Sequence, residues 1–264
     1  MDKHSLLFTP KPKPLARFRL LCFPYAGGNA STYIPWFKGL HDEAEITLVQ
    51  LPGRGVRFST PPYQNMKDLV HDVFQALNQL SRKENVFFGH SMGAKIAYEL
   101  TLQLYTRQYT LPIHVISSGS AAPGKSPKDE FIHTLSDQAF VERLRSINGT
   151  PEGVLENKEL ISLMMSMLRA DFKIAETYQN KCQLKLPTTV SIFAGTNDDI
   201  EKDELESWKH LFSSNTGIHW FEGDHFFINK NKDAVLKKLN QILESKLNAP
   251  AEIISSALST PYKT

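Results

Sequence analysis

The stretch that decides the fold is residues 85–99, NVFFGHSMGAKIAYE. A short apolar run leads into Gly-His-Ser-Met-Gly (89–93), and a helix-like pattern follows. A Gly-x-Ser-x-Gly pattern between a strand and a helix is typical of a nucleophile elbow, a strained turn that holds the serine hydroxyl away from both backbone arms. Side chains at the two flanking positions would collide with the neighbouring chain, so glycine is needed there. We therefore predict Ser91 as a nucleophile; the alternative is a plain turn that caps a helix.

Short apolar runs bounded by Gly, Pro or Asn alternate with helical patterns along most of the chain. Such runs are typical of buried parallel strands, and we expect them at residues 17–23, 46–51, 86–88, 114–117, 189–194 and 218–221. Apolar residues at steps of three and four predict helices over residues 66–80, 92–106 and 235–243. The alternation predicts an α/β protein with a mostly parallel sheet covered by helices on both faces.

One region breaks the alternation. Residues 124–182 have helical patterns and no convincing strand, so we predict a helical lid above the strand ends, where ligands bind in open α/β sheets. Its methionines could adapt to varied ligands, although packing into a core is the more common role of such a stripe. Residues 17–247 are predicted to form one domain. The Pro- and Lys-rich segment 1–16 is expected to be flexible and the tail 248–264 to be disordered.

Composition excludes several classes of protein. Thirty basic and 28 acidic residues give the 264-residue chain a net charge of +2. This near-neutral charge lacks the excess of basic residues that is typical of nucleic-acid-binding proteins. No apolar run approaches the roughly 20 residues of a membrane span, and the N-terminal residues lack the apolar region of a secretory signal. The nine histidines and two cysteines show no metal-binding spacing. We expect a cytoplasmic protein, monomeric by default, without metal.

A serine nucleophile needs a base and an acid, which in this fold class follow in the order Ser, Asp, His. His225 comes just after the last predicted strand, on a Gly-Asp turn, and is the predicted base. The acid should follow the preceding strand, where Asp198 and Asp199 stand side by side. Either could accept the hydrogen bond from the histidine, and Asp224 is a distant third candidate.

Two backbone N–H groups are predicted to bind the developing oxyanion. Met92 opens the helix after the serine, where free N–H groups point at the same spot. The second donor should lie in the Gly-rich turn after the first predicted strand, Phe23–Gly28. We favour Ala26 in that turn, with Tyr25 as the alternative.

Several separate blocks resemble the stand-alone type II thioesterases of non-ribosomal peptide and polyketide synthases, whose vertebrate relatives are medium-chain fatty acyl thioesterases. The resemblance covers roughly residues 15–247. It rests on FPYAGG (23–28), QLPGR (50–54), GHSMG (89–93), NGTP (148–151), LRADF (168–172) and GDHFF (223–227). In the family the acid stands three residues after a glycine, and Gly195 plus three is Asp198. Family members commonly carry Gly-His or similar at the histidine, and Asp224 departs from this pattern. Its carboxylate could raise the pKa of the histidine or simply face solvent.

The resemblance implies an α/β-hydrolase fold and hydrolysis of acyl thioesters. The acyl group would hang from the phosphopantetheine arm of an acyl or peptidyl carrier protein, so no cofactor of the enzyme's own is expected. The family's task is to clear stalled or mis-primed carriers or to release a product. Arg54 and Arg57 could bind the pantetheine phosphate or an acidic carrier surface, although loop charges are more often merely solvated. The alternatives are an esterase or acyltransferase of the same fold and a non-catalytic carrier-binding protein.

Overall fold

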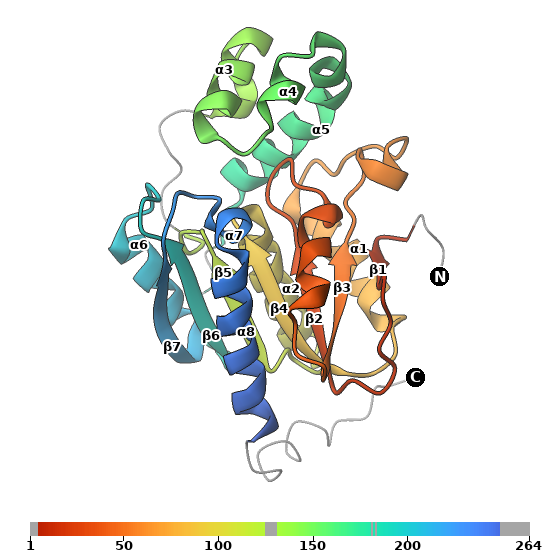
Figure 1. Ribbon diagram of the computed structural model, residues 1–264, viewed down its shortest axis with the longest axis vertical. Coiled ribbons are helices and arrows are strands. Elements are labelled where there is room, and N and C mark those ends of the chain that lie inside the picture. Colours follow the sequence, from red (N-terminus) through yellow and green to blue (C-terminus); the bar gives the residue numbers. More distant parts are fainter. Residues whose placement is uncertain (1–4, 125–130, 181, 183, 249–264) are drawn as a thin grey trace.

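The computed structural model describes residues 5–124, 131–180, 182 and 184–248, and its described strands form one seven-stranded sheet (Figure 1). The strand order is β1-β3-β2-β4-β5-β6-β7; β1 pairs antiparallel with β3, and every other neighbouring pair is parallel. The strands are β1 Leu7–Phe8, β2 Phe18–Phe23, β3 Ala44–Val49, β4 Glu84–His90, β5 His114–Ser118, β6 Leu186–Gly195 and β7 Phe212–Phe221. The predicted mostly parallel sheet is confirmed.

Helices cover both faces of this sheet because successive side chains of a strand point to opposite sides. In β2, Leu21 and Phe23 pack with the side chains of α1 and α2, whereas Leu20 and Cys22 pack with those of η1 and α8. The four helices are α1 Met66–Asn78, α2 Met92–Thr106, η1 Ala30–Lys38 and α8 Lys232–Leu247. Figure 1 shows α8 in front of the sheet. Burial on both faces explains why the strands read as continuous apolar runs.

A helical insertion joins β5 to β6 and lies beyond one end of the sheet (Figure 1). It consists of η3 Ile132–Thr134, α3 Asp137–Ile147, α4 Glu152–Leu155 and α5 Lys158–Thr177, and the described residues between 124 and 182 contain no strand. Its apolar side chains form a small core of their own around Phe140, Leu144 and Leu168. Met167 belongs to that core, and Met164 and Met165 pack against it, as the packing interpretation expected. The C-terminal part of α5 joins the main core through Ile174.

Shorter helices complete the chain. They are η2 Gly55–Arg57, α6 Lys202–Glu206, η4 Ser207–His210 and α7 Phe227–Lys230.

The N-terminal segment differs from expectation, because residues 5–16 are part of the fold rather than a flexible arm. Leu7 is buried, and β1 aligns it with Val49, so apolar burial and an edge-strand ladder hold it. Of the predicted tail, residues 249–264 lie outside the described residues.

The order of the strands in the sheet indicates where a ligand would bind. The chain passes from β2 to β3 on one side and then returns to β4 on the other side of β2. The loops that leave β2 and β4 therefore diverge at a topological switch point, the place where open α/β sheets bind ligands. Phe23 at the end of β2 aligns with Gly89 near the end of β4, so the loop after β2 and the turn after β4 begin side by side.

Candidate active site

Ser91 occupies the strained turn that the sequence predicts between β4 and α2. Its φ of 55° and ψ of −117° are rare for a residue with a side chain. The Ser91 N–H donates to the Ser118 carbonyl at 2.8 Å, which ties the turn to the end of β5. A Cβ at Gly89 would lie 2.1 Å from the Gly93 carbonyl oxygen, and one at Gly93 would lie 2.3 Å from the Phe23 carbonyl oxygen. Only glycine allows this close approach, as the pattern predicted.

His225 and Asp198 are brought together by the parallel pairing of β6 and β7. Nδ1 of His225 lies 2.9 Å from Oδ2 of Asp198, whose side chain is only 6% exposed. A carboxylate only accepts hydrogen bonds, so Nδ1 carries the proton and Nε2 is left as the acceptor that a general base needs. The neighbouring Asp199 is exposed to solvent. Geometry thus favours Asp198, the residue that the family spacing indicated.

Asp224, the third candidate acid, has other partners. One carboxylate oxygen accepts the Phe226 N–H at 2.9 Å, and the other accepts the Lys230 ammonium at 2.8 Å. The hydrogen bond from Lys230 is the main cause that lowers the pKa of Asp224. Asp224 therefore shapes the turn that carries His225.

The loop after β2 lies beside the elbow, as expected for a second oxyanion donor. The Gly28 N–H donates to the Tyr25 carbonyl at 2.8 Å, which closes a turn around Ala26. A trans peptide directs its N–H opposite to its C=O, so the Ala26 N–H points away from Gly28. On the other side, α2 begins at Met92, directly after Ser91. The loop that carries Ala26 thus begins against the elbow, where Gly93 lies close to Phe23 and Pro24, and Met92 directly follows Ser91.

His90 is a site residue that the sequence analysis passed over as part of the elbow motif. It is fully buried, its Nδ1 lies 2.9 Å from the Ser118 hydroxyl, and its ring centroid is 5.1 Å from that of His225. Burial, and then the proximity of His225, lowers the pKa of His90 well below its usual value. The Tyr25 ring packs edge-on against both His90 and Phe226. A neutral His90 and its aromatic neighbours thus pack against the predicted base.

Arg54 is not available to a phosphate. Its guanidinium is buried and bonds both carboxylate oxygens of Asp171 in α5, at 2.6 and 2.7 Å. Arg57 donates to the Gln50 carbonyl at 3.1 Å. The hypothesis that Arg54 binds the pantetheine phosphate is wrong, because the carboxylate already occupies its donors. One signal for this pairing was in the sequence: Asp171 stands three residues after Leu168 in an otherwise apolar helix stripe, where a buried acid needs a partner.

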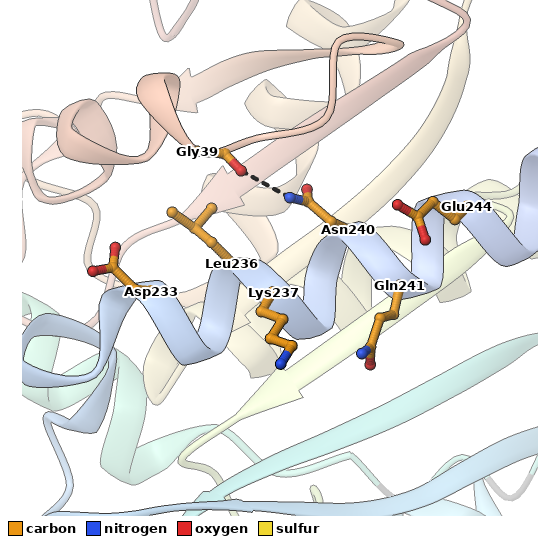
Figure 2. A pocket seen from close by; sticks show the side chains of 7 residues that line it. All are labelled: Gly39, Asp233, Leu236, Lys237, Asn240, Gln241 and Glu244. Atoms are coloured by element: carbon orange, nitrogen blue, oxygen red, sulfur yellow. Dashed lines mark hydrogen bonds between the residues drawn. The ribbon is translucent and has the colours of Figure 1, made fainter.

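A shallow groove elsewhere on the surface does not involve the predicted catalytic residues (Figure 2). It has a volume of about 490 Å³ and runs along α8 beside Gly39. Asn240 bridges this junction, donating to the Gly39 carbonyl at 2.8 Å and accepting the His41 N–H at 2.9 Å. The groove is a packing seam between α8 and the end of η1.

Within residues 5–124, 131–180, 182 and 184–248, no three His, Cys, Asp or Glu side chains gather as metal ligands. No helix in the described part of the chain is both long and apolar enough to cross a bilayer.

Comparison with known proteins identifies the family. The family model described as "Thioesterase domain" matches residues 18–243. The chain belongs to this thioesterase family. Its predicted family and its activity as a thioester hydrolase are thereby confirmed.

The relatives and solved structures agree with this thioesterase assignment. The chain is 35% identical over 237 residues to the gramicidin S biosynthesis protein GrsT of Aneurinibacillus migulanus, covering 88% of this chain and 93% of that protein. It is 34% identical over 224 residues to the human medium-chain S-acyl fatty acid synthase thioesterase, covering 81% and 82%. The crystal structure of ClbQ from the colibactin pathway superposes with a TM-score of 0.82 at 31% identity, covering 87% and 98%. The type II thioesterase BorB from the borrelidin cluster also gives 0.82, at 28% identity, covering 91% and 99%. The predicted α/β-hydrolase fold is confirmed.

Proposed function

We propose that this thioesterase hydrolyses acyl groups from the phosphopantetheine arm of acyl or peptidyl carrier proteins, through an acyl-enzyme on Ser91. The observation that carries the proposal is the 2.9 Å contact between Asp198 and His225, whose ring centroid lies 5.1 Å from that of His90, the residue before the strained elbow at Ser91. Relatives named for gramicidin S biosynthesis and for the borrelidin cluster support a synthase-bound carrier as substrate. The task would be to clear mis-primed or stalled carriers or to release an acyl product.

In the proposed mechanism, Ser91 attacks the thioester carbonyl while Nε2 of His225 takes its proton. The Met92 and Ala26 N–H groups stabilise the oxyanion, and the carboxylate of Asp198 stabilises the imidazolium. His225 then protonates the leaving pantetheine thiol. Water, activated by the same histidine, hydrolyses the acyl-enzyme. This scheme needs no resident cofactor, since the phosphopantetheine arrives with the substrate.

We also propose that the helical insertion acts as a lid over this site. A Cβ at Gly149 would lie 2.4 Å from the Phe226 ring, and one at Gly27 would lie 2.7 Å from the Leu168 side chain. The insertion therefore touches both the residue after His225 and the loop of Ala26. An acyl chain on Ser91 would meet these contacts, so the insertion is placed to shape the acyl pocket. The proposal treats the enzyme as a monomer in the cytoplasm, where its two cysteines stay reduced.

The decisive test is single-turnover hydrolysis of acetyl- and octanoyl-loaded carrier protein. Wild type should release both acyl groups, and Ser91→Ala should lower the rate by about 10⁶ because the nucleophile is lost. Ser213→Ala, at an exposed position in β7, is the matched control and should behave as wild type. Release by Ser91→Ala at more than a thousandth of the wild-type rate would contradict the assignment of the nucleophile.

Simple esters test the substrate class. p-Nitrophenyl octanoate should be turned over with a lower kcat/KM than the octanoyl carrier, since it offers no carrier contacts. A higher kcat/KM on the ester would favour an esterase over a carrier-directed thioesterase.

A further inference from the structure

A buried ion pair connects the helical insertion to the body of the enzyme. Arg54, in the loop after β3, donates through Nη1 and Nη2 to the two carboxylate oxygens of Asp171 in α5. The two side chains are only 5% and 3% exposed. Such a bidentate ion pair fixes the relative orientation of the two side chains as well as their distance. Helix α5 is therefore held in one orientation relative to the loop after β3.

The same ion pair also holds the loop that carries Ala26. The Gly27 N–H donates to Oδ2 of Asp171 at 2.8 Å, and the Gly28 carbonyl accepts from Nη1 of Arg54 at 2.8 Å. The first bond fixes the peptide that follows Ala26. The peptide that precedes Ala26 is fixed by the turn from Gly28 to Tyr25. Both peptide groups that flank Ala26 are thus held by hydrogen bonds, and one of them by a side chain of the insertion.

Orientation of an oxyanion donor matters because its contribution depends on its being aimed before the reaction. A free Gly-rich loop would have to lose conformational freedom each time an oxyanion forms. Two bonds from the ion pair remove this freedom in advance: Asp171 accepts the Gly27 N–H, and Arg54 donates to the Gly28 carbonyl. The two bonds between Arg54 and Asp171 hold these two side chains in place. The Leu168 side chain, one turn earlier in α5, lies against Gly27 and packs on the same loop.

We propose that Asp171 and Arg54 are positioning residues that set the Ala26 N–H for catalysis and couple the position of α5 to the rate of acyl transfer. This inference rests on the proposed function, in which Ala26 is an oxyanion donor. The insertion then does more than enclose the acyl chain. A shift of α5 that breaks the Asp171 contacts releases the oxyanion loop, so the acylation step is fast only when the insertion is seated.

A second buried pair provides a matched control. Arg19 in β2 donates to Glu45 in β3 at 2.9 and 3.2 Å, with side-chain exposures of 3% and 5%. Arg19 lies near the start of β2, four residues before Phe23, so it is about 13 Å from the oxyanion loop at the strand rise of about 3.3 Å per residue. Removing one charge from either pair leaves a buried arginine without its counter-ion, so both changes are expected to destabilise the fold.

The test compares Asp171→Asn with Glu45→Gln in the full chain. We would measure the folded fraction by circular dichroism, then kcat and KM per folded enzyme on octanoyl carrier protein and p-nitrophenyl octanoate. The affinity for octyl trifluoromethyl ketone, which forms a tetrahedral oxyanion on the serine, is the third readout. Asp171→Asn should lower kcat about 10- to 100-fold, less than the 10²–10³ lost with a donor itself, and should weaken the ketone in proportion. KM should change less than about threefold, and Glu45→Gln should keep kcat within about threefold of wild type.

Equal kcat for Asp171→Asn and Glu45→Gln would overturn the inference, because the pair would then serve stability alone. If Asp171→Asn does not fold, Arg54→Lys replaces it in the test. This variant keeps the positive charge but loses the bidentate contact, and we expect the same loss of kcat and of ketone affinity. Wild type that turns over the ester but not the carrier would refute the proposed substrate while the ester still tests Asp171. Wild type inactive on both would overturn both proposals.

Discussion

Replacing Asp198 by asparagine is the sharpest test of how the predicted base is oriented. The side chain keeps its shape and its 6% exposure but loses its charge. The asparagine amide can present an N–H to Nδ1 of His225, where the carboxylate accepted one. The histidine would then carry its proton on Nε2, and the acceptor that takes the Ser91 proton would be lost. The imidazolium formed in the reaction would also lack its counter-charge.

The expected size of the effect separates two interpretations of the 2.9 Å contact. Losing a hydrogen bond to a charged group costs about 1.5–3 kcal/mol, which is about 10- to 150-fold in rate. Setting the wrong tautomer costs about 10⁴ in kcat in a serine hydrolase triad, or about 5.5 kcal/mol. We expect the larger value, measured as kcat on octanoyl carrier protein.

Asp199→Asn is the matched control, with the same change of charge one residue along and exposed to solvent. It should change kcat by no more than about twofold, because exposed substitutions outside the site cost less than about 0.5 kcal/mol. A loss below 150-fold in Asp198→Asn would refute the tautomer argument. A larger loss in Asp199→Asn than in Asp198→Asn would refute the assignment of the acid.

Two further predictions concern packing and pH. Gly93→Ala places a Cβ 2.3 Å from the Phe23 carbonyl oxygen. It should lower the free energy of unfolding, measured by chemical denaturation, by about 1–3 kcal/mol and remove most of the activity. Gly153→Ala, whose Cβ would have nothing within 4 Å, should change neither. Equal stability of the two variants would contradict the predicted steric role of the elbow glycine. Burial lowers the pKa of His114 from 6.5 to about 3, so only the unfolded chain binds this proton at pH 5. The free energy of unfolding should therefore fall as the pH drops below 6.5, by about 2 kcal/mol at pH 5, and His114→Gln should remove that part of the pH dependence in urea titrations at pH 7 and 5. An unchanged pH dependence in the variant would show that His114 titrates alike in both states.

Local sequence was enough to predict the sheet, the elbow and the order in which Ser91, the acid and His225 occur along the chain. The strands are continuous apolar runs because both faces of the sheet are covered, and such runs are visible without a structure. The edge strand β1 was missed because two residues, Leu7–Phe8, give no periodicity to read. Their burial depends on pairing with β3, about 40 residues away in the chain, which no local pattern reports.

Charged residues were the least predictable part of the site. Arg54 lies in a Gly- and Pro-rich loop, and such loop charges are usually solvated. Its partner Asp171 stands 117 residues later, in a helix whose docking is set by apolar packing. The sequence could show that an acid interrupts an apolar stripe, but it could not show which cation would meet it.

Sequence by itself predicted that Ser91 stands on a strained turn, because glycines on both sides of a serine between a strand and a helix are typical of that geometry. It also determined that His225 and a carboxylate follow at the ends of later strands. Tertiary structure decided where Arg54 points and showed that Asp198 reaches His225, a choice that the residues alone left open and only the family resemblance indicated. Those outcomes depend on side-chain directions across segments 27 and 117 residues apart, which are fixed only when the strands pair and α5 packs on the loop of Ala26.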